Sequence, residues 1–310
     1  MAPSVLPSAS ETTHVNNDGR LKPEDRVRLR RIPSLKNAFS VLWLYGQNIL
    51  ILMVAARINH FAVWALTFLL MGRAHAQFLS LMHEAAHRLL FAHKATNDFV
   101  GNWLLGYPTL TSTQAYRRVH MAHHKREFGE REPDVPLYAN YPVTQASLRR
   151  KLIRDATGQT GYKLLRNQMR NLRSPDARVR NTLWKMLGVQ VVIVAAFIAT
   201  GYWWMYLVFW VAPYLTVWRV INRLRSIAEH GGMREDDDRR FTTHSVHQSR
   251  FARFMMVPYN IGFHMAHHVD AGVPFRHLPE YHRLLHAANY LDSNLEYPSY
   301  PALWRALASA

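Results

Sequence analysis

Long apolar runs alternate with polar, strongly basic segments along the chain. Residues 37–56 carry no charge and are long enough, as a helix, to cross a bilayer core of ~30 Å. A second apolar run covers residues 58–82 and is interrupted by Arg73 and His75. These two runs predict a pair of membrane-spanning helices joined by a short turn.

A third apolar stretch covers residues 186–218 and is broken near Gly201. As one helix it would be ~50 Å long at a rise of ~1.5 Å per residue, which exceeds a single untilted span. Two helices, extended to about residues 181–200 and 202–222, fit the bilayer better. The pattern therefore predicts an all-α integral membrane protein with four transmembrane helices in two hairpins, beneath a helical cytoplasmic cap.

Basic residues flank these apolar runs. They are dense before the first span, between the second and third spans and after the fourth, whereas the turns near Arg57 and Gly201 carry almost none. Cytoplasmic loops of membrane proteins are enriched in Lys and Arg. We therefore expect both termini and the central segment in the cytoplasm, and we attribute the net charge of +17 to membrane topology and not to nucleic-acid binding.

The first residues differ from the rest of the chain. Residues 1–19 are polar, rich in Ser and Thr, and lack the apolar core of a signal peptide. Such a composition predicts a disordered tail. Residues 20–310 are expected to form one membrane domain, whose cytoplasmic segments build the helical cap.

Three histidine clusters lie in or beside the segments expected in the cytoplasm. Their sequences are His83-Glu-Ala-Ala-His87, His120-Met-Ala-His123-His124 and His264-Met-Ala-His267-His268. Positions i, i+3 and i+4 of a helix share one face, so each cluster aims its imidazoles in one direction. Eight imidazoles grouped in this way predict a site for more than one metal ion. Imidazole binds iron, copper, zinc and nickel, so the ligand type leaves the metal open.

The absence of cysteine narrows the chemistry. Disulfides, thiolate zinc sites, a cysteine nucleophile and an iron–sulfur centre of the chain's own are excluded. His83-Glu84-x-x-His87 taken alone matches zinc proteases, in which the glutamate is the general base. A membrane zinc protease would leave the other two clusters without a role. A non-catalytic metal-binding membrane protein is a further alternative.

Further candidates lie near the clusters in the sequence. Taken alone, His230 after the fourth span is best interpreted as an interfacial histidine. Asn260 could hold a metal-bound water. Metal-bound imidazoles also need a hydrogen-bond partner on the second ring nitrogen. Candidate carboxylate partners, each of which could equally be a cap or a surface charge, are Glu84, Glu229, Asp270 and Asp98. Histidines expected to be surface or packing residues are His75, His93, His244, His247, His277, His282 and His286.

The order HxxxH, HxxHH and HxxHH, split by a pair of spans, resembles the membrane fatty acid desaturase family. Residues 97–101 (Asn-Asp-Phe-Val-Gly) resemble that family's NDxxG segment, and residues 257–260 and 272–282 resemble further family segments. The likeness covers about residues 40–290. It implies a four-helix membrane stem under a cytoplasmic cap that holds two irons.

The resemblance also implies roles for particular residues. His230 matches the family's extra histidine after the last span and becomes a ninth expected ligand. The implied iron ligands are His83, His87, His120, His123, His124, His230, His264, His267 and His268. The spacing of three residues between His83 and His87 resembles that of the bacterial and acyl-lipid branches of the family. A bacterial cytoplasmic membrane is therefore the expected location.

The resemblance implies that O2 is a co-substrate in the oxidation of an unactivated C–H bond of a lipid acyl chain taken from the bilayer. Fatty acid desaturation is the expected reaction, and hydroxylation of a lipid or carotenoid is the alternative. The two electrons per turnover must come from a separate ferredoxin, or from a b-type cytochrome with its reductase. The basic residues 147–173 could dock such an acidic partner or lie on anionic lipid.

Overall fold

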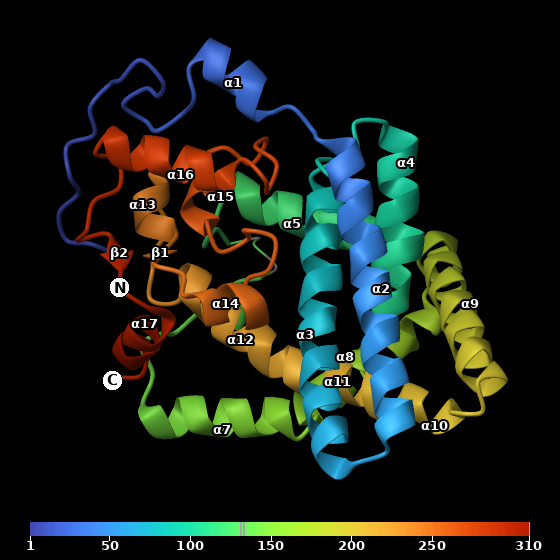
Figure 1. The fold of residues 1–310 in the computed structure, drawn as a ribbon. Helices are drawn as coiled ribbons and strands as arrows, with labels where there is room; N and C mark the ends of the chain where they lie inside the picture. The colour runs from blue at the N-terminus through green and yellow to red at the C-terminus, as the bar shows by residue number, and fades with distance from the viewer. Residues whose placement is uncertain (131, 133, 310) are drawn as a thin grey trace.

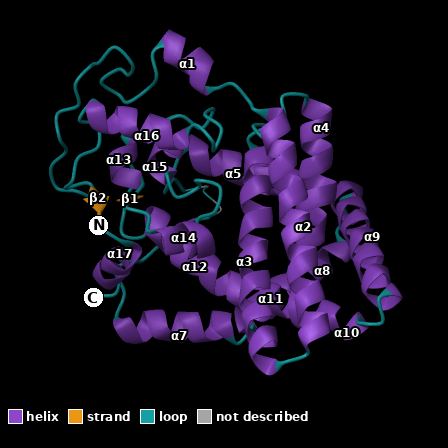
Figure 2. Cartoon of the chain, viewed as in Figure 1, coloured by secondary structure: helices purple, strands orange, loops and turns teal. Residues whose placement is uncertain are grey.

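The computed structural model describes residues 1–309 except 131 and 133. Nearly all regular structure in this part of the chain is helical (Figure 2). The short strands β1 (Ser245–Val246) and β2 (Glu296–Tyr297) pair in parallel. We call the long helices the stem (α2, α3, α9 and residues 203–230) and the part that carries most of the histidines the head (residues 113–138 and 231–309). In Figure 1, α2, α3 and α9 lie to the right and most of the head lies to the left, with the last helix of the stem reaching toward the head.

The stem begins with two antiparallel helices that lie side by side (Figure 1), α2 (Ser34–Ile58) and α3 (Phe61–Ala86). α2 forms because its sequence is apolar and contains no proline. Asn59 ends it in the left-handed conformation at φ +46°, which asparagine tolerates better than most residues. His60 then caps α3 by accepting a hydrogen bond from the N–H of Ala62.

The second half of the stem is a long helix followed by an interrupted return. α9 (Ala177–Ala199) is followed by a turn at Gly201, whose φ of +77° suits glycine. The return consists of α10 (Trp203–Met205), the π-helical η4 (Tyr206–Val211), α11 (Ala212–Leu215) and α12 (Val217–His230). Pro213 has no N–H for the helical ladder, so the break near it has a local cause.

Within the described residues, the segments long and apolar enough to cross a membrane are Pro23–Ile58, Ala177–Ala199 and Trp203–His230. They contain the first predicted span and all but one residue of the third and of the fourth. α3 covers most of the second predicted span, but Arg73, His75 and Gln77 lower its hydropathy. His75 is buried, and its Nε2 lies 2.9 Å from the carbonyl oxygen of Trp210. The structure therefore supports three spans directly and makes α3 the inner helix of the stem.

The outer surface of the stem is apolar. Large side chains that are at least 60% exposed include Leu42 and Trp43 on α2 and Val191, Val192 and Ile198 on α9. A water-soluble bundle rarely exposes an apolar patch of this kind. The surface suits contact with lipid hydrocarbon, where each helix satisfies its own backbone hydrogen bonds.

The head is built from short helices that depend on tertiary packing for their stability. They are α5 (Thr113–Lys125), α6 (Val135–Tyr138), α13 (Arg239–Thr242), α14 (Arg250–Met255), α15 (His264–Val269), α16 (Leu278–Ala287) and α17 (Tyr300–Leu307). The other elements are α1 (Pro23–Leu29), α4 (Lys94–Phe99), η1 (Val100–Gly106), η2 (Tyr107–Thr109), α7 (Gln145–Ala156), α8 (Gln159–Arg170) and η3 (Asn171–Arg173). One apolar core joins stem and head, with Phe78, Phe209 and Tyr281 among its fully buried members.

The N-terminal segment makes defined contacts with the rest of the chain. Residues 1–19 lie along the head (Figure 1). Val15 is completely buried and forms a β-bridge with Leu21. The N–H of Ala2 donates to the carbonyl of Gly232 at 3.0 Å. The contact of Ala2 with Gly232, which is far away in the sequence, helps to hold a segment whose own composition would not order it.

Candidate metal centre

The first histidine cluster occupies the end of α3. His83 lies in its last turn, His87 follows as the C-cap, and their ring centroids are 4.7 Å apart. Both ring nitrogens of His83 and the Nε2 of His87 are buried and, among the described residues, lack a hydrogen-bond partner. Leaving buried polar atoms unpaired is costly. A bound cation would satisfy nitrogen lone pairs in this position.

α5 brings the second cluster onto the first. The guanidinium of Arg117 donates to the carbonyls of Ala86 at 2.7 Å and Ala85 at 2.8 Å. These carbonyls belong to the last two residues of α3, beyond the regular helical hydrogen bonds. These hydrogen bonds hold α5 against the end of α3. As a result, the ring centroid of His120 lies 4.5 Å from that of His83.

α15 and the end of α12 complete the convergence. The Nε2 of His264 lies 3.0 Å from the Nε2 of both His230 and His268. The Nε2 of His267 lies 3.0 Å from the Nε2 of His124. A neutral imidazole nitrogen offers either one proton or one lone pair, so hydrogen bonding does not account well for a nitrogen that faces two others. Ring nitrogens that meet in this way suit a shared cation.

The converging nitrogens form two neighbouring groups. One group consists of His83, His87, His120, His124 and His267, and the other of His123, His230 and His268, which His264 joins through its contacts. Within each set of five and three, the ligand atoms lie within 4.8 Å of one another. Buried imidazoles from four helices fit two transition-metal ions. The structure thus brings together every histidine implied as a ligand.

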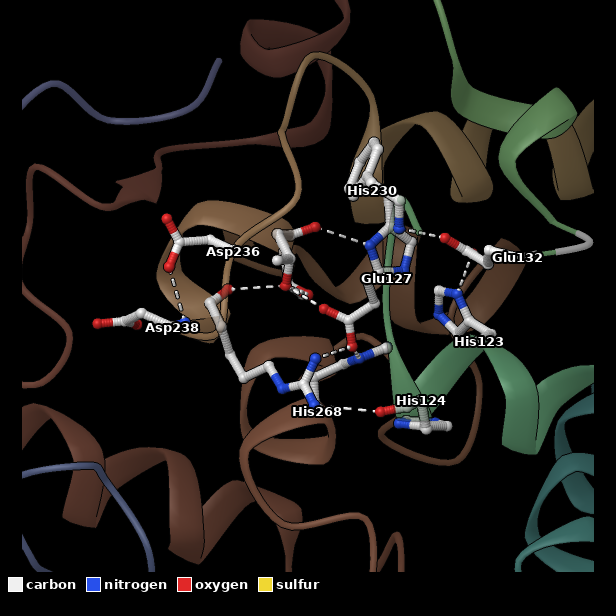
Figure 3. A network of polar contacts seen from close by, with 12 residues as sticks. His123, His124, Glu127, Glu132, His230, Asp236, Asp238 and His268 are labelled. Atoms are coloured by element: carbon white, nitrogen blue, oxygen red, sulfur yellow. Dashed lines mark hydrogen bonds and ion pairs between the residues drawn. The ribbon is translucent and has the colours of Figure 1, made fainter. Parts of the chain in front are cut away.

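Two buried glutamates that the sequence pattern did not single out lie beside histidines of the second group (Figure 3). Glu127 Oε1 lies 2.5 Å from the Nδ1 of His268, and Glu132 contacts the Nδ1 of His123. A carboxylate in this position fixes the tautomer that leaves Nε2 free for a metal. A signal was present, since both glutamates follow His124 within eight residues.

The two carboxylates are themselves held by other side chains. Glu127 pairs with Arg239 at 2.8 Å and accepts a hydrogen bond from Thr242, and Glu132 accepts one from Tyr138. Burial raises the pKa of each carboxyl to about 7, although Arg239 opposes that shift at Glu127. The position of each carboxylate is therefore set by contacts beyond the histidines, and a nearby cation would favour its charged form.

Two of the predicted outer partners lie near cluster imidazoles. Glu229 Oε1 is 3.6 Å from the Nδ1 of His264 and also accepts a hydrogen bond from Arg225 at 2.6 Å. Glu84 Oε1 is 3.9 Å from the Nδ1 of His83. Both distances exceed those of ordinary hydrogen bonds, so these contacts to the imidazoles are looser than those of Glu127 and Glu132.

The other three predicted partners make different contacts. Asn260 donates to a backbone carbonyl at 3.2 Å. Asp270 pairs with Arg30 and Asp98 with Arg117, each at 2.5 Å. Among the contacts of the described residues, none of the three reaches a cluster histidine. The carboxylates pair with guanidinium groups instead, because such charge-assisted bonds are strong wherever an arginine is in reach.

Comparison with known proteins agrees with this architecture. Fold and site define a helical protein with membrane-spanning segments and a buried multi-histidine centre. Residues 59–301 match the fatty acid desaturase family, so the chain belongs to that family and the predicted resemblance is confirmed. A relative named dihydrorhizobitoxine desaturase, from Bradyrhizobium elkanii, is 26% identical over 228 residues. The match covers 69% of this chain and 65% of the relative, less than two thirds of the relative's length.

Proposed function

We propose that this chain is a membrane-embedded, O2-dependent oxidoreductase that introduces a double bond into a lipid acyl chain. The observation that carries the proposal is the convergence of nine histidines, seven of them buried, at the end of an apolar stem. Family membership supports a lipid substrate, and the relative named as a desaturase supports desaturation over hydroxylation. Two bound iron ions would supply the activation of O2 needed to remove hydrogen from an unactivated C–H bond.

The protein's own residues hold, orient and shield such a site. Each of the two histidine groups would hold one iron, with Glu127 and Glu132 orienting rings of the second group. His83, His267 and His268 are at most 4% exposed. This burial would keep bulk water away from the reacting carbon and from side reactions.

An apolar cavity in the stem fits a lipid chain. It has a volume of about 700 Å³ and lies between α2 and α9, with Leu52, Val192, Phe78 and Trp210 in its lining. That volume is within the ~300–1,000 Å³ typical of ligand pockets. Phe78 precedes His83 by five residues, ~7.5 Å along the axis of α3. We infer that an acyl chain enters this cavity from the bilayer and points toward the first histidine cluster.

The geometry disfavours a zinc protease built on the first cluster. Glu84 is buried, and its Oε2 accepts a hydrogen bond from the N–H of Phe275 at 3.2 Å. A protease would need this carboxylate as a base facing a metal-bound water. His83 and His87 also share their group with histidines of the other clusters.

The topology we propose counts α3 as a fourth span and places the head in the cytoplasm of a bacterium. Both termini lie on the head side of the molecule (Figure 1). The short turns at Asn59 and Gly201 lie in the stem and carry few basic residues. Lysine and arginine are retained on the cytoplasmic side, so the charge distribution supports this orientation.

A separate electron donor is part of the proposal. The chain has no cysteine for an iron–sulfur centre of its own. α7 and α8 expose Arg149, Arg150, Arg154, Lys163 and Arg166. This surface complements an acidic ferredoxin or a b-type cytochrome, and contact with anionic lipid is its competing role.

Mass spectrometry of lipids from cells that express the chain tests the function. We expect new species lighter by two hydrogens with the wild type and with the exposed-histidine control His247→Ala, and none with His267→Ala. Species heavier by one oxygen would identify a hydroxylase of lipids or carotenoids. Zinc in place of iron would favour the protease. If the purified chain contains iron and is given a reductant but forms no oxidised lipid, the proposal is refuted.

A further inference from the structure

A second cluster of potential ligands lies outside the histidine centre. His282 and His286 are one turn apart on α16, and their ring centroids are 4.7 Å apart. Glu296 on β2 faces both rings: its Oε1 is 3.3 Å from the Nε2 of His282, and its Oε2 is 3.7 Å from the Nε2 of His286. The sequence predicted two isolated histidines, since Glu296 joins them only in the fold.

We propose that His282, His286 and Glu296 bind one further divalent transition-metal ion, Zn²⁺ or Fe²⁺. Their ligand atoms lie within 4.8 Å of one another. Two imidazoles and one carboxylate form a set that both metals accept, with positions left for water. Around a tetrahedral ion with bonds of ~2.1 Å, ligand atoms are ~3.4 Å apart. The observed 3.3 and 3.7 Å separations need little adjustment to reach that geometry.

The surroundings prepare these side chains for a metal. Ser245 donates a hydrogen bond to Glu296 Oε1 at 2.9 Å and thereby orients the carboxylate. Although burial acts in the opposite direction, the hydrogen bonds from His282 and Ser245 leave the pKa of Glu296 below its ordinary value. Burial, followed by the neighbouring His282, lowers the pKa of His286 and so favours its neutral, ligating form. A metal and a charged carboxylate are therefore compatible at neutral pH.

The site is reachable from solvent and separate from the histidine centre. The side chains of His282, His286 and Glu296 are 12%, 33% and 20% exposed, so an ion could enter without unfolding of the head. Its ligands come from α16 and β2, whereas the histidine centre uses α3, α5, α12 and α15. In Figure 1, α16 and β2 lie on the side of the head away from α2.

The position of the site indicates a structural role. An ion there would join α16 to β2, and through the pairing of Glu296 with Ser245 also to β1. The ring of Phe263, the residue before the third cluster, packs against His282 with centroids 5.0 Å apart. The ion would therefore stabilise the support of the third cluster without taking part in the oxidation.

Metal analysis of the purified full chain, with its histidine centre loaded with iron, tests this site. The chain is supplied with Zn²⁺ or with Fe²⁺ in separate samples, and the metal bound per chain is counted. We expect one more equivalent in the wild type and in His247→Ala than in Glu296→Gln or His286→Ala. The sample that shows the extra equivalent identifies the element.

A second readout separates a specific site from surface binding. Added metal should raise the Tm of the wild type and of His247→Ala but not that of Glu296→Gln, which keeps the side-chain shape and a hydrogen-bond acceptor for Ser245. The extra equivalent should be lost with no change in the iron of the histidine centre. Equal metal content in the wild type and Glu296→Gln, or the same metal-dependent rise in Tm, would overturn the proposal and leave a hydrogen-bonded histidine–glutamate cluster.

Discussion

A soluble protein usually buries its apolar side chains and exposes its polar ones. The stem and the head each depart from one half of this arrangement. The stem exposes large apolar residues, such as Leu42 at 70%. The head buries polar ones, such as His267 at 1%. Each arrangement is unfavourable in water without a partner. The apolar surface of the stem suits contact with lipid, and the buried imidazoles of the head suit a bound ion.

The stem helix α3 runs from the interior of the stem to the histidine centre and shows the difference within one element. His75 and His83 are two buried histidines on this helix. The first bonds to the carbonyl of Trp210 and packs against aromatic rings in the stem. The second has no hydrogen-bond partner among the described residues and faces other imidazoles. One ring nitrogen of His75 is bonded within the stem, whereas neither ring nitrogen of His83 has such a partner in the described part of the chain and the ring faces other imidazoles, which indicates a ligand.

The largest expected effect separates these two histidines. His83→Ala should lower product formation by about 100-fold or more, because it removes a proposed metal ligand and thereby disturbs the centre that the histidines share. His75→Ala should keep its iron and lose about 1–3 kcal/mol of stability. Iron content and lipid products of the two purified variants measure this. Full iron occupancy in His83→Ala would contradict the proposed centre.

Removal of metal should affect the head far more than the stem. A chelator should lower the Tm and speed hydrogen exchange in α5 and α15, because the imidazoles there would lose their shared ion. The helices α2 and α9 should keep their protection in detergent or lipid. If chelation leaves hydrogen exchange in the head as slow as it leaves exchange in the stem, the head is stable without an ion.

The outer carboxylates should have a smaller effect than the ligands. Glu127→Gln should weaken iron binding or activity by about 10–100-fold, because the amide is a poorer partner for the Nδ1 of His268. Glu130→Gln changes an exposed carboxylate nearby and is expected to leave both unchanged. Titration of iron into the metal-free variants distinguishes them. Identical iron affinity would mean that Glu127 has no part in orienting His268.

Packing inside the stem gives a comparison of two glycines. A Cβ at Gly72 would lie 2.3 Å from Cγ1 of Val217, whereas one at Gly188 would meet no atom of the described residues within 4 Å. Gly72→Ala should therefore destabilise the protein by about 1–3 kcal/mol. Gly188→Ala should be neutral or stabilise it by up to about 1 kcal/mol through helix propensity. Thermal unfolding in detergent would measure both, and an unchanged Tm for Gly72→Ala would exclude close packing of α3 on α12.

The smallest effect concerns the basic surface of α7 and α8. Raising the ionic strength from ~0.05 to ~0.5 M shortens the range of charge interactions several-fold. Electron transfer from an acidic protein donor should slow with added salt, whereas reduction by a small neutral reductant should not. A rate with the protein donor that is indifferent to salt would assign the basic surface to lipid contact instead.

The sequence by itself determined the features that depend on local spacing. Apolar runs placed the helices of the stem, and the i, i+3 and i+4 spacing grouped the histidines, because neighbours along a helix share a face whatever the rest of the chain does. The same local patterns were sufficient to assign the chain to its family. His230 needed the resemblance, since a single histidine has no spacing of its own.

Only the tertiary structure decided how these local groups meet. His268 and Glu127 are 141 residues apart in the chain, and Glu296 faces His282 across elements that share no pattern. Asp270 and Asp98 were equally plausible partners in the sequence, but they pair with Arg30 and Arg117. Such pairings depend on the packing of the whole fold and on competition between partners, because a carboxylate pairs with the donor that the fold places within its reach.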